Sequence, residues 1–383
     1  MTLKVASRGE IDPFIVMDMM RAAAELEAHG REVTHMEVGQ PGTAAPGGVI
    51  EAARRALDDN RLGYCAALGL DELRQGIARH YLDFYGVEVD PERVIVTTGS
   101  SAGFLVTALA VFEHGDRVGL SAPGYPAYRN MLAALGIDPV SIMTTVEDRY
   151  QLTPDLVAGT TATLDGLIVT SPCNPTGTMV DGDKLADLNA YCKANGIRLI
   201  SDEIYHGIDF GFAPATAARF DQAIVVNSFS KYFSMTGWRV GWLVVPEDLV
   251  RPMERLLQNL FISTATLSQI AALAAFDCHD ELRENVAAYA TNRNLLLQRL
   301  PEAGFDQLAP VDGAFYVYAD IGHMTNDSTE FCHRMLREAG VAATPGVDFD
   351  PYRGNRFVRF CFAGTQADTQ AAADRLIAWR RRS

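Results

Sequence analysis

The residues best suited to chemistry lie together near the middle of the chain. An apolar stretch ends at Ser228 and Ser230, Lys231 follows, and Arg239 comes eight residues later. A lysine amine forms Schiff bases with carbonyl compounds, and hydroxyl groups and a guanidinium are groups that bind phosphate. An amine beside a phosphate cradle predicts a phosphorylated aldehyde as cofactor, and we expect pyridoxal 5'-phosphate (PLP).

Short apolar runs around these residues predict buried strands, because they are rich in Val and Ile and are often bounded by Gly, Pro, Asn or Asp. The runs are Arg93–Thr98, Arg117–Ala122, Val140–Thr144, Leu167–Thr170, Arg198–Ser201 and Ile224–Asn227. Helical segments such as Ala102–Phe112 and Lys184–Ala194 separate most of them. This alternation predicts a mostly parallel sheet with helices on both faces. A further strand, Arg239–Val245, is expected to pair with its predecessor through a tight turn.

The last hundred residues predict a second, smaller unit. Its expected elements are a helix Asp280–Leu300, a strand Ala314–Ala319, a helix Ser328–Glu338, a strand Arg356–Phe362 and a helix from Gln366. The fold class is therefore α/β: a three-layer large domain with a mostly parallel seven-stranded sheet, plus a smaller α/β C-terminal domain. The N-terminal helix, Phe14–His29, is expected to complete the small domain. We place the boundaries at 1–45, 46–285 and 286–383.

Open parallel sheets bind ligands beyond the carboxyl ends of their strands. Five predicted strands carry polar or aromatic residues there, in the segments Gly99–Ala102, Pro123–Pro126, Ser171–Gly177, Asp202–Tyr205 and Ser228–Lys231. The amides of Ser100, Ser101 and Ala102, at a helix N-terminus, predict an anion site for the phosphate. Ser228 or Ser230, with Arg239, would complete it.

The remaining residues at this edge suit the cofactor ring. Tyr125 offers an aromatic face for stacking, although neighbouring Tyr128 is a rival and either ring could instead be core packing. Asp202 would pair with the ring nitrogen and keep it protonated. Asn174 and Tyr205 would hydrogen-bond the ring's phenolic oxygen. Lys231 would act as Schiff base and then as general base.

These motifs resemble those of the class I/II aminotransferases, which are fold-type I PLP enzymes. The similar segments are Ser171-Pro172-Cys173-Asn174-Pro175-Thr176-Gly177, Asp202-Glu203-Ile204-Tyr205, Ser228-Phe229-Ser230-Lys231 and Gly237-Trp238-Arg239-Val240-Gly241. They occur in family order, and the resemblance runs from about Val38 to Arg359. The implied activity is transfer of an amino group from an amino acid to a 2-oxo acid.

The resemblance implies three more site residues. Tyr64 matches a tyrosine that reaches the phosphate of the neighbouring subunit, which implies a homodimer with shared sites. Arg359 matches the arginine that grips the substrate α-carboxylate, and Gly39 matches a backbone position lining that carboxylate. Arg353 and Arg356 are rivals of Arg359, but Arg359 lies in a more apolar context, where a charge needs an anionic partner.

The donor is expected to be neutral, apolar or aromatic, and the acceptor to be 2-oxoglutarate or pyruvate. A dicarboxylate pocket needs a second cation, and neither the helix after Ser101 nor the segment Ile11–Ile15 supplies one. A carbon–sulfur β-lyase with the same cofactor is the alternative, because the same residues serve both chemistries. A non-catalytic PLP-binding regulator is a second, more remote alternative.

Composition excludes several classes of partner. The formal net charge of −15 argues against nucleic acid. We see no signal peptide and no run of about 18 apolar residues. The six scattered cysteines form no CxxC pair and the eight histidines no metal-binding spacing, so we expect reduced thiols, no metal and a cytoplasmic location.

Overall fold

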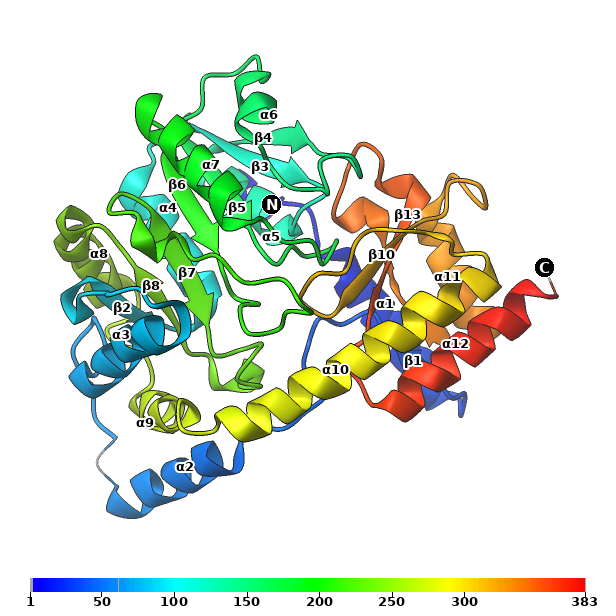
Figure 1. Ribbon diagram of the computed structural model, residues 1–383, viewed down its shortest axis with the longest axis horizontal. Coiled ribbons are helices and arrows are strands. Elements are labelled where there is room, and N and C mark those ends of the chain that lie inside the picture. Colours follow the sequence, from blue (N-terminus) through cyan, green and yellow to red (C-terminus); the bar gives the residue numbers. More distant parts are fainter. Residues whose placement is uncertain (1–2, 61, 383) are drawn as a thin grey trace.

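The computed structural model describes residues 3–60 and 62–382, and its largest element is a seven-stranded sheet (Figure 1). In spatial order the strands are β2 (Val94–Thr97), β8 (Gly241–Val244), β7 (Ile224–Ser228), β6 (Arg198–Asp202), β5 (Gly166–Thr170), β3 (Arg117–Ala122) and β4 (Asp138–Met143). Only β8 runs antiparallel to its neighbours. The predicted seven-stranded, mostly parallel sheet is therefore confirmed.

The strands are apolar on both sides because both faces of the sheet are covered by helices. The helices between residues 47 and 275 are α2 (Gly47–Asp59), α3 (Asp71–Tyr85), α4 (Gly99–Val111), α5 (Pro126–Leu135), α6 (Pro154–Ala158), α7 (Gly182–Ala194), α8 (Glu247–Leu260) and α9 (Thr266–Ala275). Leu167 and Val225 belong to the core shared with α3 and α7, whereas Ile168 and Val226 face the core shared with α4, α5 and α8.

A second, four-stranded sheet lies at the other end of the molecule (Figure 1). Its order is β12 (Thr344–Pro345), β13 (Phe357–Cys361), β10 (Tyr316–Asp320) and β9 (Gln307–Leu308), and its pairs are antiparallel. The helices of this part are α11 (Ser328–Ala339) and α12 (Gln366–Arg380), and α10 (His279–Arg299) reaches it from the larger sheet.

The N-terminal segment packs against the C-terminal part of the chain. Helix α1 (Ile15–Ala28) contacts β12 and α11, and β1 (Thr34–His35) pairs in parallel with β11 (Val341–Ala342). In Figure 1, α1 is accordingly blue among orange and red elements. These contacts agree with an N-terminal segment that completes the smaller unit, while the three domain boundaries stay a prediction.

Candidate active site

A cavity of about 940 Å³ opens at the carboxyl edge of the seven-stranded sheet. Its wall receives residues from the ends of β2, β3, β5, β6 and β7 and from the approach to β8. The predicted site residues that line it are Gly39, Ser100, Ser101, Tyr125, Asn174, Asp202, Tyr205, Ser230, Lys231, Arg239 and Arg359. The sheet therefore brings most of the predicted site into one space.

Lys231 lies in the connection between β7 and β8, where its amine faces the cavity. Its Nζ donates a hydrogen bond to the carbonyl oxygen of Gly39 at 2.6 Å and lies 5.8 Å from the centre of the Tyr205 ring. Burial lowers the pKa of this amine to about 8, and the positive charges of Arg359 and Arg239 act in the same direction. An amine of this pKa is partly neutral near pH 7.5, so it can act as a nucleophile and as a base.

Asp202 ends strand β6, and its carboxylate is buried beneath the cavity. The hydroxyl of Tyr128 donates a short hydrogen bond to Oδ2, and the backbone N–H of Ile204 donates to Oδ1 at 3.2 Å. Burial raises the pKa of Asp202 to about 6, whereas these two hydrogen bonds lower it. The tyrosine thus favours a charged carboxylate in a site that otherwise disfavours it.

The N-terminus of α4 (Gly99–Val111) lies against the guanidinium of Arg239. No side chain among the described residues caps this helix, so its first amides are free for a ligand. Gly99 has a φ of +72°, and a side chain there would collide with the guanidinium of Arg239. The glycine therefore lets the arginine lie against the helix terminus, where Ser100, Ser101 and Ser230 supply hydroxyl groups.

Arg359 lies on β13, on the side of the cavity formed by the smaller sheet. Its Nη1 donates to Asn174 Oδ1 at 2.8 Å, and its Nη2 donates to Thr344 Oγ1 at 3.1 Å and to the carbonyl of Glu37. All its hydrogen bonds to described residues reach neutral groups, and its buried Nε has no partner among them. A buried cation with a free donor favours an anionic ligand.

The two rival arginines are already neutralised. Arg353 pairs with Asp350 at 2.9 Å, and Arg356 pairs with Asp320 at 3.0 Å. Neither lines the cavity, which favours the choice of Arg359.

Tyr125 and Tyr205 both line the cavity but make different contacts. Tyr125 packs edge-on against Phe14 and Tyr128, with ring centres 5.7 and 5.3 Å apart, and its hydroxyl has no hydrogen bond to a described residue. The hydroxyl of Tyr205 lies 2.6 Å from that of Tyr316.

Three predicted cofactor residues lie outside the cavity wall. The hydroxyl of buried Ser228 hydrogen-bonds the carbonyl of Val240 at 3.1 Å and the hydroxyl of Ser230 at 2.9 Å, so it supports Ser230 from behind. Ala102 is buried within α4 and offers only its backbone. Tyr64 is 85 % exposed and does not line the cavity of its own chain.

The sequence reasoning missed several residues of the cavity. The sequence predicts Tyr128 as core packing or as a stacking ring, and it gives no local signal for Tyr316 or Phe349. The rings of Tyr316 and Phe349 lie 4.5 and 4.7 Å from the Arg359 guanidinium. The apolar part of the wall is formed by Phe14, Val16, Met17, Met20, Phe104, Leu105, Met131, Ile204 and Phe349.

The rest of the described chain offers little for other chemistry. Within residues 3–60 and 62–382, no cluster of His, Cys, Asp or Glu could hold a metal ion, and no helix has the length and apolarity to cross a membrane. The six cysteines form no disulfide, and Cys173, beside Asn174, is buried with its pKa raised to about 11.

The chain is similar to several aminotransferases. Residues 31–376 match the family model of aminotransferase class I and II. A valine–pyruvate aminotransferase of Mycobacterium tuberculosis is 47 % identical over 99 % of both chains, and a (5-formylfuran-3-yl)methyl phosphate transaminase of Methanocaldococcus jannaschii is 32 % identical over 95 % of this chain and 96 % of its own. The crystal structure of an aminotransferase from Mycobacterium tuberculosis superposes with a TM-score of 0.97 at 47 % identity, covering all of both chains.

Proposed function

The chain belongs to the class I and II aminotransferases, and we propose that it moves the amino group of an aliphatic amino acid to pyruvate, with PLP bound at the carboxyl edge of the large sheet. The charges of the cavity carry this proposal. Of the described residues that line it, three are cationic, namely Lys231, Arg239 and Arg359. Each has a task in the proposed reaction, so none is left to hold a second substrate carboxylate.

The residues present fit PLP. The free amides of α4, with Ser230 and Arg239, suit its phosphate, and the buried carboxylate of Asp202 suits a protonated ring nitrogen. Tyr125 would stack on the ring, and Asn174 and Tyr205 would hydrogen-bond its phenolic oxygen, since all three line the cavity. Tyr64 would come from the partner subunit of a homodimer. When bound, PLP supplies the electron sink that allows the Cα–H bond of an amino acid to break.

Lys231 has two tasks in this proposal. Its amine would hold the cofactor covalently until an amino acid displaces it, and the freed amine would then take a proton from the substrate Cα. The pKa of about 8 suits both tasks, because a fraction of the amine is neutral near neutral pH and the amine is still basic enough to accept a proton. In the second half of the reaction the same amine would return a proton to the Cα of the amino acid formed from the 2-oxo acid.

Arg359 and Asn174 would hold the substrate α-carboxylate. The guanidinium is fixed between Tyr316 and Phe349 and by Asn174, so little side-chain freedom is lost when a carboxylate binds. The substrate side chain then lies against apolar residues such as Met17 and Leu105. The name of the relative from Mycobacterium tuberculosis supports valine as donor and pyruvate as acceptor.

A single-turnover spectrum tests the proposal. Purified PLP-loaded enzyme is mixed with valine, alanine, phenylalanine or aspartate and no acceptor, and the band near ~420 nm is followed as it is replaced by one near ~330 nm. We expect valine to react at least about tenfold faster than aspartate, since a buried unpaired carboxylate is strongly disfavoured. Adding pyruvate should restore the first band. Fastest reaction with aspartate would refute the substrate class. In a parallel incubation with a cysteine conjugate, persistence of the ~420 nm band while pyruvate and ammonia accumulate would favour a lyase.

A further inference from the structure

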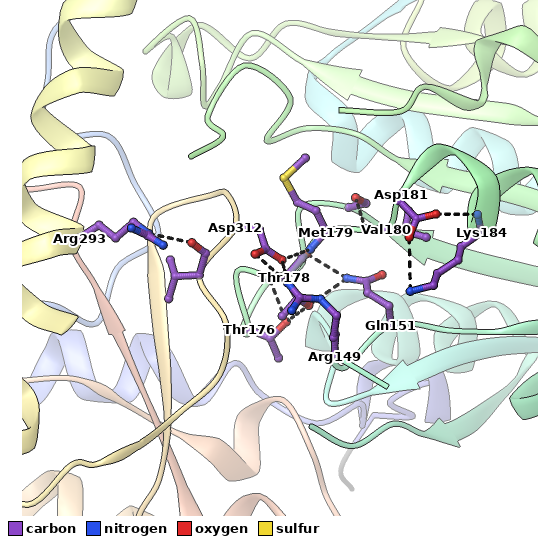
Figure 2. Close-up of polar contacts among 12 residues, drawn as sticks. Arg149, Gln151, Thr176, Thr178, Met179, Val180, Asp181, Lys184, Arg293 and Asp312 are labelled. Carbon is purple, nitrogen blue, oxygen red and sulfur yellow. Dashed lines mark hydrogen bonds and ion pairs between the residues drawn. The ribbon is translucent and has the colours of Figure 1, made fainter. Parts of the chain in front are cut away.

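A polar junction outside the cavity joins the loop of Asn174 to the segment that leads into β10 (Figure 2). We propose that Asp312 and Arg149 are positioning residues for the substrate carboxylate, because their ion pair fixes this junction. The inference rests on the proposed function, in which Arg359 binds that carboxylate. Neither Asp312 nor Arg149 lines the cavity, so both act through other residues.

The side chain of Asp312 joins three segments of the chain. One nitrogen of Arg149, Nη2, lies 2.8 and 2.6 Å from its two carboxylate oxygens, and the backbone N–H of Met179 donates to Oδ2 at 3.1 Å. Figure 2 shows the three residues converging. The Asp312 side chain is only 15 % exposed, so the pair is less screened by solvent than a surface ion pair.

The backbone closes the same junction. The carbonyl of Gly177 accepts hydrogen bonds from the N–H groups of Asp312 and Gly313, at 3.0 and 2.9 Å. Gly177 has a φ of +73°, and a Cβ there would lie 3.1 Å from the carbonyl oxygens of Gly313 and Tyr316. The Asn174 loop and the start of β10 are therefore in direct contact, and a side chain at Gly177 would be crowded by the carbonyl groups of the β10 segment.

The Arg149 side of the junction is held in an uncommon conformation. Arg149 and its neighbour Tyr150 both lie in the left-handed region, with φ of +54° and +53°. Non-glycine residues persist there only where surrounding contacts fix them. Asp148 supplies such contacts by accepting from the N–H and hydroxyl of Thr145, and the Gln151 amide donates to the carbonyl of Thr178 at 2.9 Å. Figure 2 places Gln151 and Arg149 on the same side of the Thr176–Val180 loop.

Both elements that the Asp312–Arg149 pair joins contact Arg359. Asn174, three residues before Gly177, accepts from Arg359 Nη1 at 2.8 Å, and Tyr316, on β10, places its ring 4.5 Å from the guanidinium. Lys231 follows β7 and Asp202 ends β6, so neither lies on the two elements that the Asp312–Arg149 pair joins. Breaking the Asp312–Arg149 ion pair should therefore disturb binding of the substrate carboxylate more than proton transfer by Lys231.

Asp312→Asn is the direct test, and Asp320→Asn is its matched control. The asparagine keeps an oxygen for the Met179 N–H but removes the charge. Asp320 lies at the far end of β10, is 18 % exposed and pairs with Arg356 at 3.0 Å, so the control removes a comparable ion pair away from the Asn174 loop. Both variants are assayed as PLP-loaded enzyme for KM and kcat with valine and pyruvate, and for thermal unfolding.

We expect Asp312→Asn to raise both KM values by about 3- to 30-fold, the range seen for residues that act on a ligand from outside its site, with kcat within about twofold of wild type. The single substitution Arg149→Lys keeps the positive charge opposite Asp312, so it should leave both KM values within about threefold of wild type. Asp320→Asn should leave KM unchanged even if it lowers the unfolding temperature equally. Equal KM values for the two asparagine variants, or a fall in kcat alone, would overturn the inference.

Arg359→Lys separates this inference from the proposed function. If it raises KM and Asp312→Asn does not, only the positioning role fails. If Arg359→Lys leaves KM unchanged, the carboxylate binds elsewhere and both proposals fall. Should Asp312→Asn not fold, Arg149→Met breaks the same pair from a side chain that is 40 % exposed, and the same expectations apply to it.

Discussion

Tyr128→Phe should move the acid limb of the pH–activity profile to higher pH. The substitution keeps the ring, which is buried against Phe104 and Tyr125, and removes only the hydroxyl that donates to Asp202. In the proposed reaction Asp202 must be ionised to keep the ring nitrogen protonated, so activity falls as pH falls through its pKa. Burial raises the pKa of Asp202, and the hydrogen bond from the Tyr128 hydroxyl lowers it. Removing the hydroxyl must therefore raise the pKa of Asp202.

The size of the shift follows from the hydrogen bond. A hydrogen bond to a charged group contributes about 1.5–3 kcal/mol, and one pKa unit corresponds to about 1.4 kcal/mol, so the pKa should rise by about 1–2 units. Starting from about 6, the carboxylate would titrate near ~7–8. At one pH unit above the wild-type limb, the ionised fraction would fall from about 90 % to between about 10 % and 50 %, which predicts a two- to tenfold loss of kcat/KM at that pH. About three units above the wild-type limb the loss should largely disappear.

The assay is kcat/KM for valine and pyruvate between pH 5.5 and 9.5 in wild type and Tyr128→Phe. A bound, positively charged ring nitrogen lowers the absolute position of the limb in both proteins, so the difference between them is the measured quantity. Asp202→Asn is the control, because a neutral amide should give low activity without this limb. An unmoved limb, or a loss of the same size at every pH, would refute the role assigned to the hydroxyl.

Three further changes test the proposed site. Lys231→Ala should abolish the ~420 nm band and lower transamination by about 10²–10⁴-fold or more, because it removes the general base; a variant that keeps either would exclude this lysine. Arg359→Lys should raise the KM of both substrates by about 10- to 100-fold, from loss of about 1.5–3 kcal/mol of charged hydrogen bonding, whereas Arg356→Lys should not. Tyr64→Phe subunits mixed with Lys231→Ala subunits should recover activity above that of the Tyr64→Phe homodimer, because each intact Lys231 would receive Tyr64 from its partner; no recovery would place Tyr64 in its own subunit's site.

The elements of the large sheet were predictable because local signals agree with tertiary structure. The buried strands read as Val- and Ile-rich runs bounded by turn residues, and their ends were placed to within one or two residues. The pairing of β8 with its predecessor β7, which the sequence predicts through a turn, is also observed, and the pair is antiparallel. The strand itself begins at Gly241, later than the predicted Arg239, because Arg239 takes a left-handed conformation against α4.

Contacts between distant side chains were not predictable in this way. Tyr128 looks like a core residue because its ring is one, and only the fold directs its hydroxyl to Asp202. Asp312 and Arg149 are ordinary polar residues far apart in sequence, and nothing local marks them as partners. The place of Tyr64 depends on a second subunit, so a single sequence can suggest it only through family resemblance.

The pairing of β1 with β11 affects how the chain can fold during synthesis. Thr34 pairs with Val341, so on the order of 300 residues must be added after β1 before its partner exists. At about 5–20 residues per second this takes roughly 15–60 s. During that time the apolar face of α1, with Met19 and Ala23, has no β12 or α11 to cover it. The nascent N-terminus therefore needs protection from aggregation, and a chain that stops before β11 leaves its own first helix without a partner.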